Sequence, residues 1–225
     1  MRKGAGSWKW GDDLTVLIEV LESGGMLAIP TESSYGLAVD PNSAEAVSAL
    51  YRFKSRAAVK ALPVVLGDLE QLTRVGADPS SPELAELAAL WPAPLTVVVP
   101  LERPIPASAG MRTLAVRVPA HDRLRTLLQD LGGPLTATSA NPSGGIPVSD
   151  PRLLAPMLVG WPSVIVDDGI LEGGPASTIV QIGEAGYRVL RVGALSPGWI
   201  RDRVSRRVFS AAPAEIPADD SRQTP

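Results

Sequence analysis

Apolar residues recur along the chain with a helical spacing in some stretches and as short continuous runs in others. The first helix is indicated by apolar side chains three or four residues apart that end before the glycine pair at residues 24–25: Leu14, Leu17, Ile18 and Leu21. A second helix, over residues 42–53, has Asn42 as its expected N-cap and Glu45 at the capping-box position. Further helices are predicted from Ser81-Pro82 to about residue 91, over residues 122–131, and from Ser196-Pro197 to about residue 208.

Short apolar runs between these helices predict strands. They cover residues 26–30, 36–40, 62–66, 95–99, 114–118, 135–139, 164–167, 178–182 and 187–192. Because the strands alternate with helices without an internal repeat, we expect one layered α/β domain with a mixed sheet over residues 12–209. Residues 1–11 are then an N-terminal extension, and residues 210–225, which are rich in Pro, Ala, Asp and Ser, are expected to form a disordered tail.

Composition narrows the chemistry that the chain can perform. Its 225 residues include no cysteine, which excludes disulfides, thiolate catalysis and cysteine-ligated zinc. The single histidine, His121, cannot build a multi-histidine metal site, and no G-x-S-x-G motif offers it a catalytic serine. We therefore expect His121 to be a polar residue at the point where a strand passes into a helix.

Charge and hydropathy bear on the cellular location of the protein and on whether it binds nucleic acid with a large basic face. No run of about 18 apolar residues is present, so no membrane span is expected. The first thirteen residues, MRKGAGSWKWGDD, lack the apolar core of a secretory signal, which favours a cytoplasmic location. A net charge of −3 argues against a protein that wraps nucleic acid with one large basic face.

Polar residues gather near the ends of two early elements. Residues 30–36, Pro-Thr-Glu-Ser-Ser-Tyr-Gly, join a strand to a hydroxyl-rich turn that could hold a small polar ligand against Tyr35 or be an ordinary turn. Lys54 and Arg56 are two residues apart, so in an extended segment they would present two cations to one place. Such a pair could neutralise polyphosphate, and a solvated basic loop is the alternative.

Two later strands also carry polar groups among apolar ones. Alternation places Thr113 and Arg117 on the same strand face, and a buried arginine needs a partner there. That partner is either a substrate carboxylate or an internal Asp or Glu. Ser139 and Asn141 share a face as well, although the Asn-Pro-Ser-Gly-Gly run that follows is typical of a simple turn. Walker A and G-x-G-x-x-G phosphate loops are both missing.

Taken in order, these segments resemble the YrdC/TsaC family of threonylcarbamoyl-AMP synthases over roughly residues 12–192. The similar segments are residues 29–37 (IPTESSYGL), 50–56 (LYRFKSR), 91–96 (WPAPLT), 114–119 (LAVRVP), 138–144 (TSANPSG), 168–169 (DG), 177–180 (STIV) and 190–193 (LRVG). The family's hallmark is a K-x-R pair that acts with S-x-N, and both are intact at Lys54, Arg56, Ser139 and Asn141.

This resemblance implies a YrdC-like twisted sheet of parallel and antiparallel strands, flanked by helices, with a concave basic cavity. It implies that the amine of L-threonine captures bicarbonate as a carbamate, whose oxygen attacks the α-phosphorus of ATP. Pyrophosphate leaves with Mg²⁺, which arrives with ATP, so no protein-bound metal is expected. A separate tRNA threonylcarbamoyl transferase complex would then move the group to an adenosine next to the anticodon.

The resemblance also assigns roles to individual residues. Lys54 and Arg56 are the expected catalytic pair, because they would neutralise phosphate charge in the transition state. The expected ATP contacts are those two together with Ser139, Asn141, Ser177 and Arg191, with Thr113 as a lesser candidate. The expected threonine pocket consists of Thr31, Tyr35 and Arg117, with Arg117 opposite the carboxylate.

The chain departs from the family pattern at two places. Ala57 and Ala61 stand where the family usually has proline, so we expect a looser basic loop and weaker preorganisation of Arg56 and Lys60. The longer members of the family carry a second C-terminal domain, and no lid from such a domain is expected here.

Three other functions compete with this one. A non-catalytic YrdC-like module would contact RNA, with Arg201, Arg203, Arg206 and Arg207 on one basic helix. A related carbamoyl-adenylate enzyme would need cysteine-rich zinc domains that this sequence lacks. An inactive paralogue is disfavoured by the intact hallmark residues.

Overall fold

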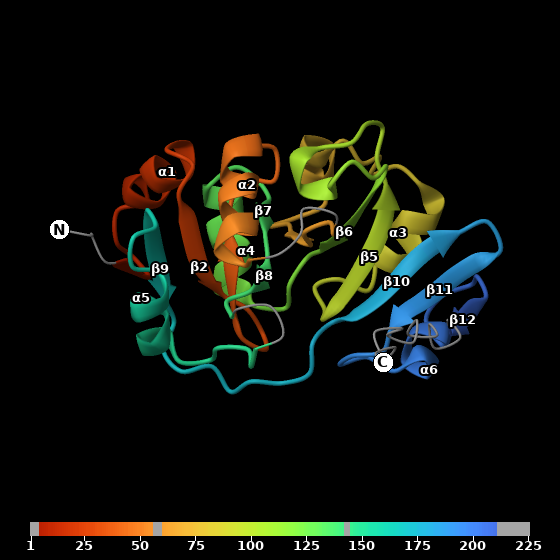
Figure 1. The fold of residues 1–225 in the computed structure, drawn as a ribbon. Helices are drawn as coiled ribbons and strands as arrows, with labels where there is room; N and C mark the ends of the chain where they lie inside the picture. Colours follow the sequence, from red (N-terminus) through yellow and green to blue (C-terminus); the bar gives the residue numbers. More distant parts are fainter. Residues whose placement is uncertain (1–4, 56–59, 142–144, 211–225) are drawn as a thin grey trace, which may run out of the picture.

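The computed structural model describes residues 5–55, 60–141 and 145–210, in which the strands form two sheets (Figure 1). The five-stranded sheet has the order β1-β9-β2-β3-β8. Its strands are β1 (Gly6–Lys9), β9 (Ser163–Asp167), β2 (Met26–Pro30), β3 (Tyr35–Ala38) and β8 (Thr138–Ser139). β1 and β2 run parallel to β9, whereas β3 is antiparallel to both β2 and β8.

The seven-stranded sheet has the order β12-β11-β10-β5-β6-β4-β7. Its strands are β12 (Val208–Ser210), β11 (Gly186–Arg191), β10 (Thr178–Gly183), β5 (Leu95–Pro100), β6 (Thr113–Arg117), β4 (Val64–Val65) and β7 (Leu135–Thr136). The pairs β10–β5, β11–β12 and β4–β6 are parallel, and the remaining pairs are antiparallel. The predicted mixture of parallel and antiparallel strands is therefore confirmed.

Residues 135–139, predicted as one strand, are divided between the two sheets. β7 pairs with β4 in the larger sheet and β8 pairs with β3 in the smaller one, with only Ala137 between them. The backbone N–H of Thr136 also donates to the carbonyl oxygen of Val39 at 2.9 Å, and that of Ala137 to Pro63 at 2.8 Å. The segment consequently fixes one sheet beside the other.

Helices flank both sheets (Figure 1). The α-helices are α1 (Thr15–Glu22), α2 (Ala44–Phe53), α3 (Pro82–Ala88), α4 (Asp122–Asp130), α5 (Leu154–Met157) and α6 (Pro197–Arg201). Three short 3₁₀ helices lie at η1 (Glu70–Val75), η2 (Pro106–Ser108) and η3 (Pro151–Leu153). Leu17 of α1 and Leu50 of α2 belong to two separate buried clusters, and each cluster contains side chains from both sheets.

The helix termini follow local side-chain chemistry in most places. Ser81 and Ser196 cap α3 and α6 by accepting the N–H of Leu84 and Trp199, and both helices have proline in the first turn, as predicted. His121 is the N-cap of α4 and accepts the N–H of Leu124, which agrees with its expected place between a strand and a helix.

Two further predictions about elements were wrong, and one strand was not predicted. The N-cap of α2 is Ser43, which accepts the N–H of Ala46, whereas the Asn42 amide donates to the carbonyl oxygen of Arg74. The last helix ends at Arg201, and residues 208–210 form β12 by pairing with β11, so the arginines after it do not form one basic helix. The strand β1 was not predicted, and it places Trp8 in the buried core, with only 5% of its surface exposed.

No helix within residues 5–55, 60–141 and 145–210 has both the length and the apolar character needed to cross a membrane.

Candidate functional site

A cavity of about 480 Å³ is lined by residues of both sheets. The turn before β3 contributes Thr31, β3 contributes Tyr35, and β8 contributes Ser139. The larger sheet contributes Arg117 from β6 and Arg191 from β11. Among the described lining residues, these two arginines are the only charged ones, so the cavity presents positive charge to any molecule inside it.

Arg191 forms the cationic part of the wall that belongs to the larger sheet. Its Nη2 and Nε donate to the carbonyl oxygen of Ser177 at 2.8 and 3.2 Å, and the hydroxyl of Ser177 lies 2.8 Å from that of Thr96. Burial lowers the pKa of Arg191, and the positive charge of Arg117 lowers it further. None of the ion pairs within the described ranges includes Arg191. An anionic ligand would relieve this electrostatic cost.

Arg117 has an internal acidic partner, one of the two alternatives that the sequence left open. Its Nη1 donates to Glu32 at 2.7 Å, and the second carboxylate oxygen of Glu32 accepts the N–H of Ala120 at 2.6 Å. Glu32 therefore fixes the direction of the guanidinium. Because the side chain of Arg117 is 13% exposed, part of it remains accessible from the cavity.

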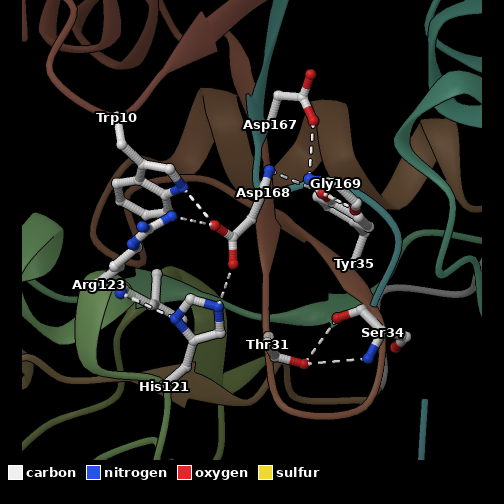
Figure 2. Close-up of polar contacts among 10 residues, drawn as sticks. Trp10, Thr31, Ser34, Tyr35, His121, Arg123, Asp167, Asp168 and Gly169 are labelled. Carbon is white, nitrogen blue, oxygen red and sulfur yellow. Dashed lines mark hydrogen bonds and ion pairs between the residues drawn. The ribbon is translucent and has the colours of Figure 1, made fainter. Parts of the chain in front are cut away.

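The opposite wall has hydroxyl groups that are bonded within the protein. The hydroxyl of Thr31 donates to the carbonyl oxygen of Ser34 at 2.7 Å and closes the turn. The hydroxyl of Tyr35 donates to the carbonyl oxygen of Gly169 at 2.8 Å and accepts the N–H of Asp168 at 3.0 Å (Figure 2). Burial raises the pKa of Tyr35 to about 12, so this hydroxyl stays protonated near neutral pH.

Lys54 lies behind this wall, outside the lining of the cavity. Its ammonium donates to the carbonyl oxygens of Ser139 and Asn141, both at 2.6 Å, and the residue is only 4% exposed. The expected solvated or extended loop is wrong here, because Lys54 is the C-cap of α2 and Ser55 has a positive φ of 47°. The structure thus brings together three of the four hallmark residues through the backbone of the S-x-N segment.

The remaining predicted residues differ in their relation to the cavity. Ser139 and Ser177 line the cavity, as Thr31, Tyr35, Arg117 and Arg191 do. Asn141 is buried beside Lys54, and its amide donates to the carbonyl oxygen of Gly145. Thr113 shares the face of Arg117 but does not line the cavity. Arg56 and Ala57 lie outside the described residues, whereas Ala61 does line the cavity.

Sequence reasoning missed two side chains at this site. Glu32 was given no role of its own, although an internal Asp or Glu was one of the two partners expected for Arg117. Thr96 was also unassigned, and its contact with Ser177 depends on the parallel pairing of β5 with β10. Neither contact can be read from local periodicity.

Comparison with known proteins identifies the family. The model of Sua5/YciO/YrdC, described as "Telomere recombination", matches residues 19–193. The chain belongs to this family. A threonylcarbamoyl-AMP synthase of Coxiella burnetii is 34% identical over 173 residues, which are 75% of this chain and 90% of that protein. A threonylcarbamoyl-AMP synthase of Halorhodospira halophila is 42% identical over 130 residues, 56% of this chain and 68% of that protein.

A solved structure agrees with this family membership. Sua5 of Pyrococcus abyssi complexed with L-threonine has a TM-score of 0.79 and 30% identity, and the match covers 91% of this chain and 62% of that chain. The Sua5/YciO/YrdC fold is therefore confirmed along most of the sequence. Since the named relatives are synthases, the comparisons favour the catalytic interpretation over a non-catalytic RNA-binding module.

Proposed function

We propose that this chain is an L-threonylcarbamoyladenylate synthase, a nucleotidyltransferase that forms threonylcarbamoyl-AMP and pyrophosphate from L-threonine, bicarbonate and ATP. The observation that carries the proposal is the cavity between unlike walls, with Arg117 and Arg191 on one wall and Tyr35 and Ser139 on the other. Membership of a family whose named relatives catalyse this reaction supports it.

The proposed reaction has two steps, carbamate formation and adenylyl transfer. The amine nitrogen of threonine forms a bond to the carbon of bicarbonate, water is lost, and a carbamate results. A carbamate oxygen then attacks the α-phosphorus of ATP, the bond to the bridging oxygen breaks, and pyrophosphate leaves as its magnesium complex. Positioning and charge neutralisation are the main demands on the protein, because adenylyl transfer needs no covalent enzyme intermediate.

The ATP side of the cavity is assigned to the wall of Arg191. Its guanidinium, oriented by the carbonyl of Ser177, would face the phosphates, and the hydroxyls of Ser177 and Ser139 would donate to phosphate or ribose oxygens. Lys54 would act without lining the cavity. Its ammonium would hold the S-x-N segment through the carbonyl oxygens of Ser139 and Asn141 and place a positive charge next to it. Arg56 completes the catalytic pair in this proposal, and Thr113 remains a lesser candidate for an ATP contact.

The threonine side is assigned to Thr31, Tyr35 and Arg117. Because Glu32 orients Arg117, the guanidinium can offer its other nitrogen to the substrate carboxylate without moving far. Thr31 and Tyr35 already use their hydroxyls within the protein, so they would shape the pocket more than they bond the substrate. Magnesium would enter with ATP and needs no ligands from the protein.

The product is a mixed anhydride, so a second enzyme must consume it quickly. We assign that step to a tRNA threonylcarbamoyl transferase complex in the cytoplasm, with any contact between this chain and RNA serving delivery. The proposed pathway places threonylcarbamoyladenosine next to the anticodon of tRNA.

The decisive measurement is pyrophosphate release from ATP in the presence of magnesium, with L-threonine and bicarbonate omitted in turn. We expect release only when both are present, and threonylcarbamoyl-AMP should be detected by mass spectrometry in the same samples. D-threonine serves as the matched control. Release that continues without L-threonine would falsify the proposal.

A further inference from the structure

The carboxylate of Asp168 collects three hydrogen-bond donors from two distant segments (Figure 2). Its Oδ1 accepts the indole N–H of Trp10 at 2.6 Å and the guanidinium of Arg123 at 2.9 Å. Its Oδ2 lies 2.9 Å from Nε2 of His121. The carboxylate is 17% exposed, so these bonds form at the border of the buried region.

The tautomer of the His121 ring follows from its second contact. Nδ1 accepts the backbone N–H of Leu124 at 3.2 Å, so the neutral ring carries its proton on Nε2 and donates it to Asp168. The ring also stacks on Trp10, with centroids 6.3 Å apart, and the guanidinium of Arg123 lies 5.6 Å from the centre of the Trp10 ring. The three donors therefore support one another as well as Asp168.

The backbone of the same turn holds a residue of the cavity wall. The N–H of Asp168 donates to the hydroxyl of Tyr35, and that hydroxyl donates to the carbonyl oxygen of Gly169. Tyr35 is fully buried from solvent and lines the cavity. The side chain of Asp168 thus anchors a turn whose main chain fixes the ring of Tyr35.

The position of Trp10 depends on a strand outside the segment that the family model matches. β1 runs parallel to β9 with Lys9 opposite Asp167, which brings the next residue, Trp10, beside Asp168. The family match begins only at residue 19. The anchoring of Asp168 by Trp10 is therefore a feature that the matched region alone does not provide.

We propose that Asp168 is a positioning residue for the threonine pocket, acting through Tyr35, and that Trp10 is part of the same support. This inference rests on the proposed function for its effect on the reaction, but its structural part stands independently. The neutral donors and Arg123 hold the carboxylate, the carboxylate holds the turn, and the turn holds the tyrosine ring against which the substrate would lie.

The kinetic test compares the two substrates. Asp168→Asn keeps the size of the side chain but leaves one oxygen to serve three donors, so we expect the KM for threonine to rise about tenfold. The KM for ATP should change by less than about twofold, because the ATP wall is not touched. Trp10→Phe keeps an aromatic ring and removes one hydrogen-bond donor to Asp168. It should raise the KM for threonine by a smaller factor, again with little change in the KM for ATP.

A matched control removes a different carboxylate. Glu83 of α3 pairs with Arg206 at 2.7 Å outside the cavity, and Glu83→Gln should leave both KM values unchanged. An equal rise of both KM values in Asp168→Asn, or no rise in either, would overturn the positioning role. A fall in kcat alone would overturn it as well.

A second test needs no activity. In ¹⁵N-labelled protein, the NMR signal of the Trp10 indole N–H is assigned by its loss in Trp10→Phe. This signal should shift in Tyr35→Phe, because that variant lacks the hydroxyl that accepts the backbone N–H of Asp168. Tyr187→Phe is the matched control, because Tyr187 is equally buried and its hydroxyl bonds to Glu83 and Glu86 instead. Shifts of equal size in both variants, or none in either, would contradict the network. If the wild type releases pyrophosphate without threonine, only the proposed function fails, and this result still decides the network.

Discussion

The two walls of the cavity use their polar side chains in different ways. On the wall of the smaller sheet, the hydroxyls of Thr31 and Tyr35 are bonded to the main chain, and Lys54 is bonded to main-chain carbonyls behind it. On the wall of the larger sheet, the guanidinium of Arg191 hydrogen-bonds only to Ser177 among the described residues, and the positive charge of Arg117 acts on it. One wall has its polar groups bonded internally, whereas the other carries Arg191, which has no acidic partner in the described ranges.

This difference between the walls indicates how each of them would recognise a substrate. A wall whose hydrogen bonds are internal has a fixed shape and selects by fit, since displacing any of its bonds would leave a buried group unpaired. A wall that carries Arg191, which has no acidic partner in the described ranges, attracts phosphate and stabilises charge that develops during the reaction. Shape selection and Arg117 would serve threonine, and the charge of Arg191 would serve ATP.

The largest effect is expected from Lys54, which supports the first wall while carrying charge. Lys54→Met keeps the apolar stem but removes the ammonium from the carbonyls of Ser139 and Asn141, so turnover should fall by about 10²–10³-fold. Pyrophosphate release measures this, with circular dichroism to confirm folding. Arg52→Ala, an exposed cation of the same helix, is the control. A folded Lys54→Met protein with normal turnover would remove Lys54 from the catalytic set.

A smaller effect, confined to ATP, is expected on the second wall. Arg191→Ala removes the cation that has no acidic partner in the described ranges, and the KM for ATP should rise about tenfold. The KM for threonine should stay nearly constant. Arg188→Ala changes an exposed arginine of the same strand and should affect neither. If Arg191→Ala raised the KM for threonine more than the KM for ATP, the assignment of Arg191 to the ATP side of the cavity would be wrong.

The pair Arg117–Glu32 joins the two walls and should give a still smaller effect. Arg117→Gln is expected to raise the KM for threonine about fivefold, and Glu32→Gln somewhat less, because Glu32 acts by orienting Arg117. The double variant should be no worse than Arg117→Gln alone, as required of two residues that act as one unit. Additive losses in this double-mutant cycle would show that Glu32 has a separate role.

The smallest effect concerns stability at alkaline pH. Burial raises the pKa of Tyr35 to about 12, while the unfolded chain titrates near the ordinary value of 10.0. Between those values the unfolded state loses its proton first, so the free energy of unfolding falls as the pH rises. Tyr35→Phe cannot titrate, and its fall in Tm from pH 9 to 11.5 should be smaller by roughly 2–4 °C. Thermal unfolding followed by circular dichroism checks this, and a fall as steep as that of the wild type would contradict the buried, protonated hydroxyl.

Much of the fold was predictable because local signals agreed with the final packing. The strand over residues 26–30 and the end of α2 at Phe53 were predicted where the structure has them, since a buried apolar run and a helical stripe each have one stable solution. The helix expected to reach residue 208 was wrong, because pairing with β11 made a strand of residues 208–210. β1 was missed because the short segment from Gly6 to Lys9 has too little pattern of its own.

The candidate site likewise was predictable in its residue types but not in the contacts between them. Residue types and spacing marked Thr31, Tyr35, Lys54, Arg117 and Ser139, but the spacing argument for Lys54 failed because the chain turns at Ser55. The partner of Arg117 stands 85 positions away, and the contact of Trp10 with Asp168 spans 158 positions. Side-chain chemistry identifies what a residue can do, whereas its partner is set by which strands pair.

The sequence by itself determined the order of most elements, the absence of cysteine chemistry and the set of polar residues from which a site could be built. Those properties depend on local periodicity and on side-chain type, which the chain carries without folding. Only the tertiary structure decided that one wall is satisfied internally and the other left cationic. That outcome depends on contacts between residues distant in sequence, which the pairing of strands within the two sheets and the link through residues 135–139 bring about.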